Sequence, residues 1–99
     1  MGHILENIVY LELIRRGYEI HIGKVGDAEV DFIAIGAEGE EYYQVSQTVL
    51  EEQTLKRELS SLDAIKDHNP KYLLTMDYTP LTSYNGIKQV NVLEWLLKK

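Results

Sequence analysis

The chain has 99 residues, of which 44% are hydrophobic and 26% are charged, and its formal net charge at pH 7 is −6; this length predicts one domain with a modest core. The absence of cysteine excludes disulfides and thiolate chemistry, and the acidic balance argues against general binding to DNA or RNA. No stretch has the pattern of a signal peptide or the length of a membrane-spanning helix, so we expect a cytoplasmic protein without membrane partners.

The first predicted element is a helix over residues 4–16, which Gly17 closes as a C-terminal cap. Glu6 lies on its apolar side, because the residues three, four and seven positions later are all apolar. Two interpretations of Glu6 remain open. It is either an acid that faces inward, or an acid in a frayed first turn that favours the helix dipole and faces water.

Three strands are expected next. Alternation of apolar and polar residues indicates strands over 18–22, 27–35 and 41–46, with turns over 23–27 and 36–40 between them. The third strand is rich in aromatic residues and valine, which favour extended structure. The short connections predict an antiparallel meander.

Asp31 is the unusual residue of the second strand. If that strand alternates regularly, Val30, Phe32 and Ala34 share one face, and Asp31 lies among isoleucines on the other. An ionised carboxylate in apolar surroundings is costly unless a partner or a metal ion compensates it. The identity of that partner is the main question that the sequence raises.

A helix, two strands and a closing helix follow the meander. Apolar residues that recur every three to four positions predict a helix that begins at Thr48 or near Thr54 and stops before Pro70. The segments expected after it are strand 71–76, covered on both faces, loop 77–86, strand 87–92 and helix 93–97. The order α-β-β-β-α-β-β-α predicts an α/β fold in which helices flank a mixed β-sheet.

Several common kinds of site are absent from the sequence. Gly23 and Gly26 are too few for a phosphate-binding loop, and no Gly-Lys-Ser/Thr follows them. The three histidines lie too far apart in the sequence to suggest a metal-binding pair. The tyrosines, spread over strands of an acidic chain, are interpreted as packing residues.

The polar residues that can converge are Glu6, Asp31 and two residues on one face of the third strand, Gln44 and Ser46. If that face is also the face of Asp31, oxygen atoms from one helix and two strands gather at one point. Carboxylate oxygens completed by water are the ligands that Mg²⁺ prefers.

The order of elements, with one acid early in the first helix and another in the second strand, resembles the PD-(D/E)XK nuclease superfamily, which has the restriction-endonuclease-like fold. Six patches resemble more specifically the C-terminal domain of unknown function of prokaryotic AAA-type ATPases. The patches are GHILEN (2–7), LELIRRGY (11–18), EVDF (29–32), YYQVS (42–46), TLKREL (54–59) and DHNPK (67–71). This resemblance implies a prokaryotic domain that follows an ATPase module in a longer protein.

The superfamily pattern gives Glu6 and Asp31 the role of metal ligands, which would hold Mg²⁺ or Mn²⁺ in an active enzyme. Its next motif is Glu-x-Lys in the third strand, where this chain has Gln44-Val-Ser46. Glutamine supplies no negative charge. Serine cannot orient or deprotonate the attacking water, or stabilise the phosphate charge, as lysine does.

Two functions follow from the resemblance. The substitutions in the third strand imply a degenerate, non-catalytic domain without a cofactor, acting as a regulatory, docking or substrate-recognition module of an ATPase in cis or in trans. The alternative is a Mg²⁺-dependent DNA nuclease that uses Glu6, Asp31 and Gln44, with Lys56 or Arg57 in place of the missing lysine. A third interpretation is an unrelated small interaction domain with surface acids, and a homodimer through an edge strand is open in each case.

Overall fold

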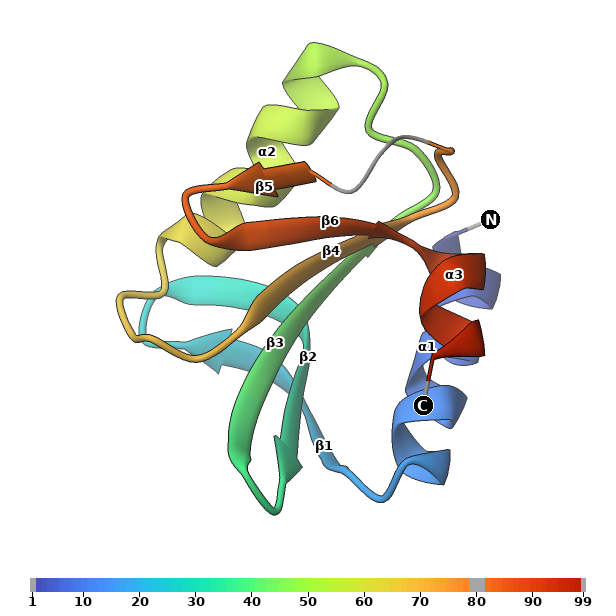
Figure 1. Ribbon diagram of the computed structural model, residues 1–99. Coiled ribbons are helices and arrows are strands. Elements are labelled where there is room, and N and C mark those ends of the chain that lie inside the picture. Colours follow the sequence, from blue (N-terminus) through green and yellow to red (C-terminus); the bar gives the residue numbers. More distant parts are fainter. Residues whose placement is uncertain (1, 79–81, 99) are drawn as a thin grey trace.

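The computed structural model describes residues 2–78 and 82–98. Within them, six strands form one mixed sheet in the order β1-β2-β3-β4-β6-β5, and three helices pack on it (Figure 1). The elements are α1 (Gly2–Arg15), β1 (Glu19–Val25), β2 (Ala28–Gly36), β3 (Gly39–Ser46), α2 (Glu52–Asp63), β4 (Lys71–Thr75), β5 (Thr82–Tyr84), β6 (Ile87–Asn91) and α3 (Val92–Leu97). The predicted α/β class with a mixed, helix-flanked sheet is therefore confirmed. None of the described helices is long and apolar enough to cross a membrane.

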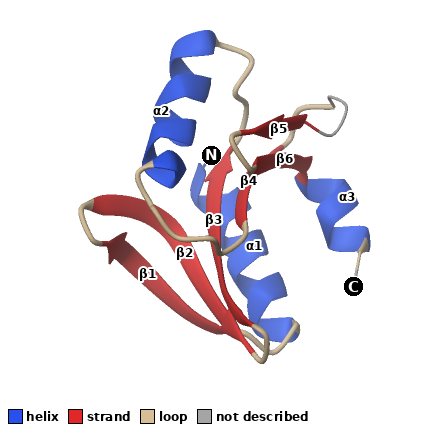
Figure 2. Ribbon diagram, turned by 60° about the vertical axis from the view of Figure 1, so that its left-hand side comes forward, coloured by secondary structure: helices blue, strands red, loops and turns tan. Residues whose placement is uncertain are grey.

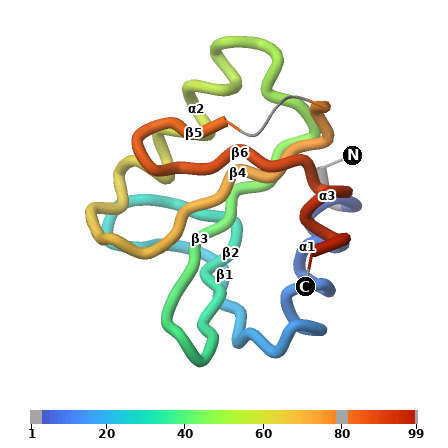
Figure 3. Tube along the Cα trace, viewed as in Figure 1, coloured from blue at the N-terminus to red at the C-terminus, as the bar shows by residue number. Residues whose placement is uncertain are grey.

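The helices cover opposite faces of the sheet. α1 and α3 lie side by side on one face and α2 lies on the other, as Figures 1 and 2 show. The two ends of the chain lie beside α1 and α3 (Figure 3). Strand β4 separates the two cores, because Leu74 packs on the α1 and α3 side and Leu73 packs on the α2 side. This confirms that β4 is covered on both faces.

Most element boundaries differ from the predicted ones by a few residues. β1 continues to Val25, so the turn that follows it shortens to residues 26–27, and β3 already begins at Gly39. Of the two predicted starts of α2, the one near Thr54 is confirmed and Thr48 is wrong, because the helix begins at Glu52. The Thr48 hydroxyl instead donates a hydrogen bond to Asp77 Oδ1 at 2.7 Å, so it fixes the loop before α2 and does not cap the helix.

The predicted loop over 77–86 contains a further strand, β5, and residues 79–81 of that loop lie outside the described residues. β5 pairs with β6 in antiparallel fashion through a two-residue turn of Asn85 and Gly86, whose φ angles are 51° and 86°. Asn-Gly is the preferred sequence for a hairpin turn that needs positive φ at both positions. The sequence prediction therefore missed one strand at the edge of the sheet.

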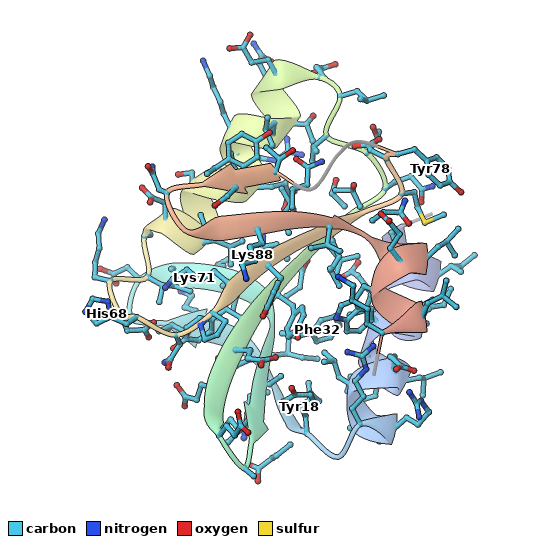
Figure 4. All side chains as sticks on the ribbon, in the orientation of Figure 1. Tyr18, Phe32, His68, Lys71, Tyr78 and Lys88 are labelled. Atoms are coloured by element: carbon cyan, nitrogen blue, oxygen red, sulfur yellow. The ribbon has the colours of Figure 1, made fainter. Side chains whose placement is uncertain are left out.

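Strand β2 contains an irregularity that changes which core its side chains enter. In the β1–β2 ladder, His21 pairs with Ile33 and Gly23 pairs with Val30. Between these pairs, Ile22 of β1 alone lies opposite two residues of β2, Asp31 and Phe32. Such a bulge shifts the alternation by one residue. Val30 therefore packs in the core under α2, whereas Phe32 and Ala34 pack in the core under α1 and α3. Figure 4 labels Phe32. The prediction that these three residues share one face is wrong.

Candidate functional site

Asp31 lies where the β2–β3 ladder ends. The last backbone pair is Phe32↔Tyr43, whereas β3 stays paired with β4 for three further residues. Beyond that pair, side chains replace the backbone ladder. The Asp31 N–H donates to Gln44 Oε1 at 2.6 Å, and the Val45 N–H donates to Asp31 Oδ2 at 2.8 Å. The two side chains thus join the strands where their backbones separate.

Gln44 is buried and uses both ends of its amide. While its Oε1 accepts from the Asp31 backbone, its Nε2 donates to Glu58 Oε1 at 3.0 Å. Gln44 lies beside Leu73 of β4, whose side chain faces α2. The hydrogen bond from Gln44 Nε2 therefore makes Glu58 of α2 a member of the site.

Glu6 approaches the same place from α1. Its side chain is partly buried, and its charge acts on both Asp31 and Glu58. α1 and α2 cover opposite faces of the sheet, so the open end of the β2–β3 ladder is approached from both sides. Of the two interpretations of Glu6, the inward-facing one fits this arrangement. We call Glu6, Asp31, Glu58 and Gln44 the carboxylate cluster.

The cluster changes the acidity of two of its members. Burial raises the pKa of the Asp31 carboxyl to about 6, opposed by the hydrogen bond from the Val45 N–H and reinforced by the carboxylates of Glu6 and Glu58. Burial also raises the pKa of Glu58, while the neighbouring Arg57 and the Gln44 amide oppose that rise. Asp31 and Glu58 are therefore both harder to ionise than an exposed carboxyl group.

A cavity of about 330 Å³ opens beside Asp31, between β1, β2 and α2. The bulge forms part of its wall, because Ile22 of β1 and Val30 of β2 line it together with Asp31. Lys24 and Gln44 add polar groups. Asp31 therefore stays accessible to small molecules and protons, although it is largely buried.

The residues expected to replace the missing lysine do not contact the centre of the cluster. Lys56 Nζ lies 3.2 Å from Glu52 Oε1, and both side chains are exposed on the outer side of α2. Arg57 Nη2 lies 3.8 Å from Glu58 Oε2, and its side chain is 72% exposed. Ser46 donates its hydroxyl to a backbone oxygen in the loop that follows β3. Lys56 therefore does not take the place of the lysine, and Arg57 reaches only the outer edge of the cluster.

The donor set does not fit a divalent cation as it is arranged. Across residues 2–78 and 82–98, no three His, Cys, Asp or Glu side chains are grouped so that they could hold one metal ion. Gln44 Oε1 already accepts from a backbone N–H, and the other end of the amide presents hydrogen atoms to Glu58. Instead, Gln44 links the backbone of Asp31 to the carboxylate of Glu58, and the Val45 N–H donates to the carboxylate of Asp31.

Sequence analysis missed Glu58, although the signal was present. Glu58 lies three residues after Leu55 and four before Leu62, on the apolar side of α2. The same spacing singled out Glu6 on α1. An acid on the apolar stripe of a helix was therefore the correct signal, applied to one helix only.

Comparison with known proteins gives one informative similarity. An uncharacterized protein of Haemophilus influenzae is 42% identical over 94 residues, which cover 95% of this chain. The same segment makes up 23% of that relative, so the chain spans about a quarter of the relative's length. No family model matches the chain, and no solved structure matches it.

Proposed function

We propose that this chain is a non-catalytic, cytoplasmic domain with a degenerate restriction-endonuclease-like fold, and that it serves as a regulatory, docking or substrate-recognition module of an AAA-type ATPase. The observation that carries the proposal is the bonding of Gln44. Its amide joins the backbone of Asp31 to the carboxylate of Glu58. Groups at the positions of a catalytic site are thus used to hold β2, β3 and α2 together.

The charge balance at the cluster supports the absence of catalysis. Phosphodiester hydrolysis needs positive charge where negative charge develops on the phosphate, supplied by a cation or a basic side chain. The cluster combines three acids with one neutral amide. The basic residues Arg57 and Lys24, of which Lys24 lines the cavity beside Asp31, are both exposed. The excess of acids over bases at this place disfavours a phosphate group.

The role as a module of a larger protein is supported by the length of the Haemophilus influenzae relative. About three quarters of that relative lies outside the segment similar to this chain. The resemblance of the six sequence patches is the ground for proposing an AAA-type ATPase as the remainder.

The first test is hydrolysis. The purified chain is incubated with plasmid, single-stranded and branched DNA in Mg²⁺ or Mn²⁺, beside the variants Asp31→Ala and Asp27→Ala. Asp27 is an exposed acid in the preceding turn, so it serves as the matched control. We expect no cleavage by any of the three proteins. Cleavage that persists in Asp27→Ala and disappears in Asp31→Ala would establish the nuclease alternative instead.

The second test is metal binding by calorimetry. Since the donor set does not fit a divalent cation, Mn²⁺ at millimolar concentration should give the same heat with the wild-type chain and with Asp31→Asn. A binding isotherm that only the wild-type chain shows would mean that the cluster rearranges around a metal ion.

The third test addresses regulation. If an ATPase module is encoded in the same polypeptide or beside it, mixing the separate module with this chain should change its rate of ATP turnover. A rate that is unchanged, together with no association in sedimentation, would contradict the proposed role.

A further inference from the structure

The outward side of α1 carries large apolar side chains that are exposed. α1 carries two apolar stripes. Leu5, Val9 and Leu13 are buried against the sheet, whereas a second stripe at the spacing i, i+4, i+7 faces outward. The outward residues are Ile4, Ile8 and Leu11, and Ile4 and Leu11 are 65% and 64% exposed. A helix that is apolar on both sides is typical of a position between two packed layers.

α3 extends this surface. Leu93 is exposed and lies across a groove from Ile4 and Ile8, and Met76 and Leu96 complete the walls. The groove has a volume of about 210 Å³, and Gln47 is the single polar residue among those that line it in the described chain. We call Ile4, Ile8, Leu11 and Leu93 the α1–α3 apolar face. A contiguous exposed apolar surface of this kind marks an interaction site.

Two observations indicate what covers this face. The Haemophilus influenzae relative continues for about three quarters of its length outside the similar segment. In addition, α1 and α3 are the first and last elements of the fold, and both chain ends lie beside them (Figures 1 and 3). Polypeptide joined to either end would leave the domain next to the α1–α3 apolar face, where tethering gives a high effective concentration.

We infer that the α1–α3 apolar face is the docking surface for an adjacent domain of the same, longer polypeptide, and that the adjacent domain presents an apolar helix or loop to the groove between α1 and α3. This inference goes beyond the proposed function, because it holds whether or not the adjacent domain hydrolyses ATP. A second copy of this chain is the competing occupant, and the experiment separates the two.

The chain has no cysteine, so single cysteines can report on the face directly. Leu11→Cys places a thiol on the α1–α3 apolar face, and Ile22→Cys places one on β1, where Ile22 is exposed and lies outside that face. Each variant is made in the 99-residue chain and in the natural polypeptide that contains it, with any cysteines elsewhere replaced by serine. The rate of maleimide labelling is then measured at equal concentrations.

We expect labelling at position 11 to be at least tenfold slower in the natural polypeptide than in the 99-residue chain, with little change at position 22. Equal rates at position 11 would overturn the inference, and so would a natural polypeptide that consists of these 99 residues alone. Labelling at position 11 that slows as the concentration of the 99-residue chain rises, with dimers in sedimentation, would assign the face to a second copy instead.

A charged substitution provides an independent measurement. Because Leu11 is exposed in the 99-residue chain, Leu11→Lys should leave the melting temperature of that chain unchanged. In the natural polypeptide the same substitution should increase cleavage by a protease at the junction between the domains. Unchanged cleavage there would contradict docking at this face even if labelling were slow for another reason.

Discussion

Asp31 carries a carboxyl group whose pKa the fold raises to about 6 from an ordinary value of 3.8, chiefly by burial. The folded chain therefore binds this proton more tightly than the unfolded chain does. Ionisation of Asp31 lowers the stability of the fold as the pH rises from 3.8 through about 6. At neutral pH the penalty is present in full, at up to about 3 kcal/mol for a shift of this size.

The first prediction follows from this sign. Asp31→Asn keeps an oxygen for the Val45 N–H and removes the charge, so it should stabilise the fold by about 1–3 kcal/mol near neutral pH. The gain should shrink as the pH falls toward 4, where the wild-type carboxyl is also neutral. Urea unfolding at the two pH values measures it, with Asp27→Asn as the exposed control. If Asp31→Asn instead lowers the free energy of unfolding by the same amount at both pH values, the charge of Asp31 does not determine the stability.

Gln44 gives a second prediction at the same scale. Gln44→Glu restores the acid of the superfamily pattern, but it removes the donor to Glu58 and adds a buried charge beside Asp31. We expect a loss of roughly 2–4 kcal/mol at neutral pH, as for other unpaired buried charges. Adding Glu58→Gln should recover much of the loss, because an amide at position 58 can donate back to the introduced carboxylate. Failure of this rescue would mean that Gln44 and Glu58 are not coupled.

At the scale of elements, α3 has six residues and contacts the residue that follows α1. That residue is Arg16. Its Nη2 donates to the backbone oxygens of Trp95 and Lys98, each at 2.6 Å, and its guanidinium lies 4.4 Å from the centre of the Trp95 ring. So short a helix is not stable by itself. The C-terminal end of the chain is therefore held by the residue that follows α1.

The third prediction tests this attachment. Arg16→Ala should cost about 2 kcal/mol, in the range of charge-assisted hydrogen bonds, and amide hydrogen exchange should accelerate in α3 more than elsewhere. Arg15→Ala is the matched control, because Arg15 pairs with the same Glu12 as Arg16 does, yet its side chain is mostly exposed. If the two variants accelerate exchange in α3 equally, Glu12 rather than the contact with Trp95 is responsible.

Most secondary-structure elements could be predicted from the sequence. Periodicity located all three helices and five of the strands, because each of them has an apolar pattern of sufficient length. β5 has three residues, and its sequence signal was the Asn85-Gly86 turn rather than any pattern of its own. The bulge in β2 had no signal, since Val30, Phe32 and Ala34 alternate without interruption. Both faces of this sheet are apolar, so alternation could not tell which helix covers which residue.

The candidate site was predictable to the extent that its members interrupt apolar patterns. Glu6 and Asp31 do so visibly, and Glu58 does so on α2. Gln44 was singled out by its place on one face of the third strand, but its hydrogen-bonding role depends on the ending of the β2–β3 ladder at Phe32↔Tyr43. Where a ladder stops is set by the twist and bulging of neighbouring strands, which local sequence does not encode.

At the scale of the whole molecule, one sheet separates two cores, and β4 contributes neighbouring leucines to each of them. Trp95, the single tryptophan, lies in the core under α1 and α3, whereas Leu62 is fully buried in the core under α2. A chain of this length is expected to unfold as one cooperative unit. Damage to the core under α2 should therefore be felt by a probe on the far side of the sheet.

The fourth prediction uses this separation. Leu62→Ala should cost about 2–5 kcal/mol through the cavity that it leaves, and the urea midpoint from Trp95 fluorescence should fall as far as the midpoint from circular dichroism. Leu97→Ala is the control, since Leu97 is 84% exposed and should change neither midpoint. A fluorescence transition that stays at its wild-type midpoint while the dichroism transition moves would mean that the core under α1 and α3 holds together on its own. Docking of a partner on α1 and α3 would then change the stability of that core without changing the carboxylate cluster.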